Sequence, residues 1–134
     1  MSPHEAQARE LLDAAQRDFI TLRVLLRDIE SPLETTLFHA QQALEKGLKA
    51  ALVQYGIVFR RTHDLLELCE IAGANNIQVP VARELLMRLG PYAVEFRYLG
   101  VVAPEVDRED ARNAVEQLLS WVEAIIASSA LQNI

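Results

Sequence analysis

The stretch FHAQQALEKGLKAAL, residues 38–52, decides the fold class of this 134-residue chain. Its side chains repeat at steps of three and four residues, the spacing that places residues on one face of an α-helix. One strip is predicted to face the core and consists of Leu37, Leu44, Leu48, Leu52 and Tyr55. A second strip has only small residues, which let another helix backbone approach closely, and consists of Ala40, Ala43, Gly47 and Ala50.

A third strip on the same helix is polar and consists of His39, Gln42, Lys46 and Lys49. Spacing alone favours a solvated outer face, supported by an ion pair between Glu45 and Lys49 four residues apart. The alternative interpretation is a donor-rich edge that meets a phosphate or a carboxylate. Both interpretations remain open at this point.

Helical periodicity continues through the rest of the chain. The expected helices cover residues 3–30, 32–55, 63–73 and 81–99, and a final one follows Asp107. Gly90 and Pro91 are expected to break or kink the fourth helix. No convincing strand and no domain linker is visible. The sequence therefore predicts one all-α domain over residues 1–134, an antiparallel up-and-down bundle of four to five helices.

Short polar residues mark the expected helix ends. Ser31 and Glu34 form a capping-box pattern before the second helix, which should end at Gly56. Thr62 is the predicted N-cap of the third helix, and Asp107 or a neighbour is the predicted N-cap of the last.

Composition excludes several function classes. A net charge of −6 and a pI near 5.0 argue against a generally basic protein that coats nucleic acid, although a local basic groove remains compatible. Cys69 is the only cysteine, so no intrachain disulfide forms, and it is interpreted as a small buried residue. No apolar run approaches ~20 residues and no signal peptide is visible, so a cytoplasmic protein without membrane contact is expected. No metal site or cofactor is predicted.

Two further polar groups allow a structural or a functional interpretation. Arg61, His63 and Asp64 open the third helix, either as a cap with solvated arginines or, together with Lys49, around an anion. Asp64 is also a candidate to orient the His63 imidazole. Arg97 either pairs with a glutamate inside the fold or binds phosphate, with Tyr98 stacking on a base.

Three elements in order resemble the HEPN domain family. The first is His39, Gln42, Ala43, Glu45, Lys46, Lys49 and Ala50; the second is RTHDL, residues 61–65; the third is Tyr92, Arg97 and Tyr98. The resemblance implies an antiparallel bundle of four or five helices that is commonly a homodimer. It also implies nucleotide binding, or partnership with a minimal nucleotidyltransferase in a toxin–antitoxin arrangement. Either the Ala/Gly strip or the last helix with Trp121 is expected to form the dimer contact.

Other members of that family are metal-independent ribonucleases marked by an Arg followed, after four to six residues, by His. None of the three histidines here has an Arg at that spacing. We therefore expect a nucleotide-binding or nucleotidyltransferase-partner module without catalytic residues. The alternative is a divergent ribonuclease that uses His63 or His39 with Arg61 or Arg97. The candidate ligand-binding residues are His39, Gln42, Lys46, Lys49, Arg61, His63, Asp64, Arg97 and Tyr98.

Overall fold

The computed structural model describes residues 2–93 and 104–132, which form α-helices without a strand. The helices are α1 (Pro3–Leu26), α2 (Leu33–Gln54), α3 (Leu65–Ala74), α4 (Arg83–Leu89) and α5 (Arg108–Gln132). A 3-10 turn, Gly90–Ala93, follows α4 directly. The predicted all-α bundle is confirmed, and so is the break at Gly90 and Pro91.

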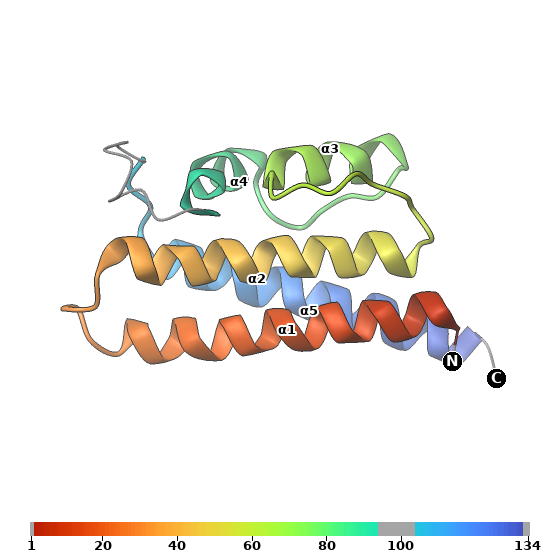
Figure 1. Cartoon of the computed structure of the whole chain (residues 1–134), viewed down its shortest axis with the longest axis horizontal. Coiled ribbons are helices and arrows are strands. Elements are labelled where there is room, and N and C mark those ends of the chain that lie inside the picture. Colours follow the sequence, from red (N-terminus) through yellow and green to blue (C-terminus); the bar gives the residue numbers. More distant parts are fainter. Residues whose placement is uncertain (1, 94–103, 133–134) are drawn as a thin grey trace.

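Three long helices make up the body of the molecule. In Figure 1, α1, α2 and α5 lie side by side, and α1 runs antiparallel to the other two. The shorter α3 and α4 cover α2 on the side away from α1. The start of α1 and the end of α5 lie at the same end of the bundle. Because α2 packs against each of the other helices, it is the central element of the fold.

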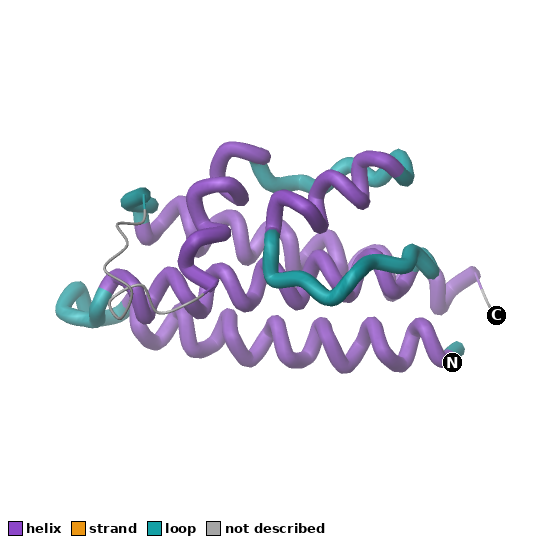
Figure 2. The backbone as a smooth tube through the Cα atoms, turned by 45° about the horizontal axis from the view of Figure 1, so that its top comes forward, coloured by secondary structure: helices purple, strands orange, loops and turns teal. Residues whose placement is uncertain are grey.

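The connection between α2 and α3 is the feature that builds the candidate site. Residues 55–64 do not turn directly into the next helix. Figures 1 and 2 show this segment running back along α2 before α3 begins. Gly56 starts the reversal with a positive φ of 70°, and Ile57 N donates to Leu52 O over 2.9 Å. This glycine-terminated helix end confirms the predicted stop at Gly56.

The leucine strip of α2 is core, as predicted. Leu37, Leu44, Leu48 and Leu52 are each at most 1% exposed. Tyr55 departs from this strip, because it follows the last helical residue and is 52% exposed. The prediction that Tyr55 lies in the core is therefore wrong.

The Ala/Gly strip of α2 is a close contact with α5. A Cβ atom at Gly47 would lie 3.0 Å from Cδ2 of Leu119 and 3.1 Å from Cδ2 of Leu118. The three alanines of the strip are fully buried inside the same chain. The close-packing prediction is confirmed, but the strip has no free surface for a second copy of the chain. The expectation that it forms a dimer contact is wrong.

Two predicted caps are replaced by neighbouring residues. Pro32 is the N-cap of α2 and makes no side-chain capping bond, so the capping box of Ser31 and Glu34 does not form. Asp64, not Thr62, caps α3, and its Oδ1 accepts from the Leu66 and Glu67 amides at 3.0 and 3.3 Å. The Thr62 hydroxyl instead accepts from the Asp64 amide at 3.1 Å.

The ends of α1 and α5 test two further predictions. The α1 helix ends at Leu26 rather than near Glu30, because Asp28 Oδ1 accepts from the Glu30 amide at 2.8 Å and forms a local turn. Asp107 begins α5 as predicted, and its Oδ1 accepts from the Glu109 and Asp110 amides at 2.9 and 3.1 Å.

Candidate anion-binding site

The carboxylate of Glu45 is the centre of a polar cluster between α2 and the segment that leads into α3. Glu45 is only 4% exposed. Its Oε2 lies 3.0 Å from Lys49 Nζ and 3.0 Å from His63 Nδ1. Its Oε1 accepts from Gln41 Nε2 at 3.2 Å. A buried carboxylate is tolerated when such donors replace water, and these three donors do so.

The pKa of Glu45 depends on two opposing effects, burial of the carboxyl group and its contacts with nearby donors. Burial alone would raise the pKa of the carboxyl, because the charged form loses solvation. Hydrogen bonds from His63, Lys49 and Gln41, together with the charge of Lys49, outweigh burial and hold the pKa below its ordinary value. Glu45 is therefore a carboxylate at neutral pH, and it fixes the positions of two nitrogen-bearing side chains.

Gln41 is a structural residue that the helical strips did not reveal. It is fully buried, and its Nε2 also donates to the main-chain carbonyl of His63 over 3.1 Å. Gln42 Nε2 in turn donates to Gln41 Oε1 over 2.7 Å. Gln41 thereby holds the returning segment against α2, and Gln42 holds the Gln41 side chain in place. The spacing of Gln41 and Glu45, four residues apart beside the leucine strip, was the available sequence signal.

His39 and Lys46 point to a different partner, on α1. His39 Nδ1 lies 3.0 Å from Asp18 Oδ1, and Lys46 Nζ lies 2.6 Å from Asp18 Oδ2. The three side chains are between 13 and 30% exposed. The polar strip of α2 is thus neither one solvated face nor one continuous wall. Its His39 and Lys46 join α1, while Lys49 joins Glu45 and Gln42 joins Gln41.

His63 is held by Glu45 and not by Asp64. The Asp64 carboxylate is occupied in capping α3, as described above. The expectation that Asp64 orients the imidazole is therefore wrong. The His63 side chain is 73% exposed even though its Nδ1 contacts a buried oxygen. Its outer ring edge faces solvent.

A cavity of about 410 Å³ lies beside this cluster and brings Lys49 of α2 together with Arg61 of the returning segment. His4 and Gln7 of α1 also line it. Arg61 forms no ion pair or hydrogen bond with the residues that the structure describes. Its guanidinium is therefore available to a ligand. His4 is not among the ligand-binding residues predicted from the sequence.

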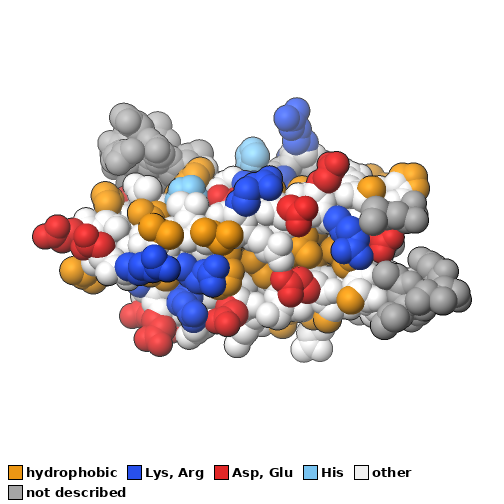
Figure 3. Space-filling model, turned by 90° about the horizontal axis from the view of Figure 1, so that it is seen from below, with side chains coloured by type: hydrophobic (Ala, Val, Ile, Leu, Met, Phe, Trp, Pro, Cys, Tyr) orange, Lys and Arg blue, Asp and Glu red, His pale blue; other side chains and the backbone are white. Residues whose placement is uncertain are grey.

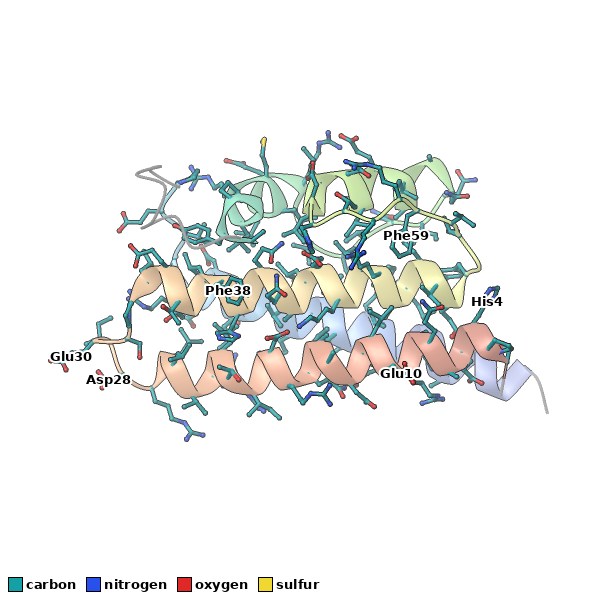
Figure 4. All side chains as sticks on the ribbon, viewed as in Figure 1. His4, Glu10, Asp28, Glu30, Phe38 and Phe59 are labelled. Carbon is teal, nitrogen blue, oxygen red and sulfur yellow. The ribbon has the colours of Figure 1, made fainter. Side chains whose placement is uncertain are left out.

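Apolar side chains supply the rest of the cavity wall. They include Val53, Ile57 and Phe59. Figure 4 shows Phe59 on the segment above α2 and His4 at the end of the bundle where α2 stops. The face formed by α1, by contrast, carries interspersed acidic and basic side chains (Figure 3). A cationic group beside an apolar wall is the composition expected of a small-molecule site.

Other predicted features are placed as follows. Arg97 and Tyr98 lie outside the described residues. Trp121 is half-buried and lines a second cavity with Tyr55 and Ile57. Burial raises the pKa of the half-buried Cys69 thiol, which fits an inert residue. Within the described ranges no three His, Cys, Asp or Glu side chains cluster to hold a metal ion, and no helix there is long and apolar enough to span a membrane.

Comparison with known proteins agrees with this architecture. The HEPN domain model matches residues 8–125. The crystal structure of an archaeal HEPN homologue superimposes with a TM-score of 0.65 at 22% identity, over 90% of this chain and 98% of the other. At that identity the superposition shows a shared fold. No curated protein matches the chain. The family match spans most of the sequence, and this chain belongs to the HEPN domain family.

Proposed function

We propose that this HEPN domain binds a nucleotide, whose phosphate groups contact Arg61 and Lys49. The observation that carries the proposal is that one cavity has both of these cationic side chains in its wall. Arg61 comes from a segment that returns along α2, so the two charges meet only in the folded chain.

The size and lining of the cavity support a nucleotide over a bare anion. Its volume of about 410 Å³ falls within the range of roughly 300–1,000 Å³ that is typical of small-molecule sites. Arginine binds phosphate through two parallel hydrogen bonds, whereas an aromatic side chain such as Phe59 offers a surface for a base. The apolar Val53 and Ile57 lie in the same wall.

Local charge also supports the proposal in a protein of net charge −6. The Lys49 ammonium is balanced by Glu45, so it directs an anion without adding net charge. Arg61 is the uncompensated cation of the cavity among the described residues. An anionic ligand is therefore expected to depend more on Arg61 than on Lys49.

Thermal unfolding in the presence of ATP tests the proposal. A ligand that binds only the folded state at 100 times its Kd adds about 2.7 kcal/mol to the free energy of unfolding. For a domain of this size the melting temperature should rise by several degrees, since ~1 kcal/mol shifts it by roughly 2–8 °C. An unchanged melting temperature at millimolar ATP would count against nucleotide binding.

A metal-independent ribonuclease is the second candidate function. It is favoured by His63, whose ring contacts a buried carboxylate through Nδ1 and exposes its other edge, an arrangement suited to proton transfer. His39 is less suited, because it is 25% exposed and paired with Asp18. Incubation with labelled RNA in the presence of a chelator tests this function. Cleavage that disappears in His63→Ala supports it, and intact RNA with the wild-type protein rejects it.

The resemblance to the family also leads us to propose a protein partner, either a second copy of this chain or a minimal nucleotidyltransferase. The core of a homodimer interface is more apolar than the rest of a protein surface. Tyr55 and Val58 follow the end of α2, are 52% and 93% exposed, and are candidates for such a contact. Light scattering at micromolar concentration tests the dimer: twice the monomer mass supports it, and a monomeric mass rejects it.

A further inference from the structure

We propose that Glu45 is the positioning residue of this anion site and that His63 is its third, proton-dependent anion-binding group. The ligand class is a phosphate-bearing molecule, and the inference rests on the proposed function. It adds two residues that do not line the cavity, Glu45 and His63, and it predicts how binding changes with pH.

The position of His63 follows from a shared oxygen atom. Lys49 Nζ and His63 Nδ1 each lie 3.0 Å from Oε2 of Glu45. The two nitrogens are therefore separated by no more than twice that distance. Lys49 lines the cavity and His63 does not, so the imidazole lies next to a cavity-lining group but outside the lining itself.

The orientation of the ring follows from the same contact. Nδ1 faces the buried carboxylate, and Nε2 lies on the opposite side of the imidazole. The side chain is 73% exposed, and Nε2 forms no hydrogen bond with the described residues. Gln41 Nε2 holds the His63 main chain through a 3.1 Å bond to its carbonyl. Main chain and ring are both anchored, while one ring nitrogen stays available to a ligand.

Protonation of His63 changes the charge of this cluster. With a neutral imidazole, Glu45 and Lys49 cancel, and a bound proton adds one positive charge. The charged residues within four positions of His63 are Arg60, Arg61, Asp64 and Glu67. Lys46 of α2 is paired with Asp18, and Glu70 of α3 is paired with Arg83. Arg60 is paired with Glu67, and Asp64 accepts two amides of α3. Histidine is the residue type that changes charge between about pH 5 and 8.

His39 is the histidine of α2 that lies away from the cavity, and it provides the comparison for His63. Its Nδ1 contacts Asp18 of α1, and it does not line the cavity. A His39→Gln variant therefore serves as the matched control for His63→Gln. Glutamine keeps a hydrogen-bonding side chain in both places and carries no charge at either pH.

Isothermal titration calorimetry with ATP at pH 5.5 and pH 8.0, at constant ionic strength, tests the inference. The titration of ATP itself is common to all variants, so each variant is compared with wild type at the same pH. At pH 5.5 His63→Gln should bind about tenfold more weakly than wild type, a factor that corresponds to ~1.4 kcal/mol. At pH 8.0 the two should bind within about twofold of each other. His39→Gln should follow wild type at both pH values.

The Glu45→Gln variant tests whether Glu45 positions the His63 ring. This variant should lose the dependence on pH that His63 provides, although His63 is present, because the ring is no longer held beside Lys49. Circular dichroism confirms that the variant is folded; if it is not, the His63→Gln comparison alone decides.

Two results would overturn the inference in distinguishable ways. If His63→Gln follows wild type at both pH values while ATP binds, His63 is not a ligand group, and the proposed nucleotide site stands without it. If wild type binds no ATP at either pH, the proposed function fails, and the inference fails with it.

Discussion

The ammonium of Lys46 lies 2.6 Å from a carboxylate oxygen of Asp18, although 28 positions separate the two residues in the chain. His39 contacts the other oxygen of the same carboxylate at 3.0 Å. One acidic side chain of α1 thus contacts two nitrogen-bearing side chains of α2, at the most extensive helix contact among the described residues. The consequence is that part of the polar strip of α2 is structural, and only its other part adjoins the cavity.

Replacing Asp18 should destabilise the fold. In Asp18→Ala, Lys46 and His39 remain partly buried without their acceptor, and the expected cost is about 1–3 kcal/mol. Urea unfolding monitored by circular dichroism measures it. Asp13→Ala is the control, because Asp13 is exposed on the same helix and should change stability by less than ~0.5 kcal/mol. Equal effects of the two substitutions would show that Asp18 does not join the helices.

Two glycines in helices should respond oppositely to alanine. A Cβ at Gly47 meets Leu118 and Leu119 at about 3.0–3.1 Å, and crowding of ~1–3 kcal/mol should exceed the gain of ~1 kcal/mol in helix propensity. Gly73 has no atom within 4 Å of the added carbon, so Gly73→Ala should stabilise by about 0.5–1 kcal/mol. Thermal unfolding compares them. A Gly47→Ala variant as stable as Gly73→Ala would contradict the tight contact of α2 with α5.

The lowered pKa of Glu45 predicts a specific dependence of stability on pH. A carboxyl whose pKa is lower in the folded state stabilises the fold above its unfolded pKa, near the ordinary value of 4.5. That contribution is lost as the pH falls through the lower, folded pKa. Glu45→Gln should therefore be less stable than wild type at pH 6, and the difference should shrink below about pH 4.5. Denaturant unfolding from pH 3 to 6 measures this difference in stability. A difference that grows towards low pH would contradict a lowered pKa of Glu45 in the folded state.

The cap of α3 should contribute measurably. Asp64→Ala removes the oxygen that accepts two amides and should cost about 0.5–2 kcal/mol, whereas Asp64→Ser should retain most of the stability because serine also caps helices. Equilibrium unfolding of both variants provides the comparison. If both lose the same stability, the capping bonds are not the source of the effect.

Helix periodicity in the sequence was sufficient to predict the fold class, because burial of apolar faces follows local spacing. The leucine strip and the Ala/Gly strip follow from that spacing, and the break at Gly90 follows from the proline beside it. Cap identity was harder to predict, since Thr62 and Asp64 are both capping residues and only the path of the chain selects one. The prediction that Tyr55 lies in the core was wrong for a related reason. The helix ends one residue before Tyr55, so this side chain is not on the helical face.

The candidate site could be predicted in part. Lys49 and Arg61 were expected around one anion, and both line one cavity. The partners of the polar residues could not be read from spacing, because Asp18 meets Lys46 only through the packing of α1 on α2. The same holds for Glu45 and His63, which meet only because residues 55–64 return along α2.

Calorimetric titration of ATP into wild type, Arg61→Ala and Arg112→Ala at pH 8.0 tests the central claim most directly. Arg61 is the suitable target, because removal of Lys49 would also leave the buried Glu45 without its cation. Arg112 on α5 pairs with Glu116 and does not line the cavity, so it controls for the lost charge. We expect saturable binding to wild type, unchanged affinity in Arg112→Ala and at least about tenfold weaker binding in Arg61→Ala. Equal affinity in all three proteins, or no binding to wild type, would contradict a nucleotide site at Arg61.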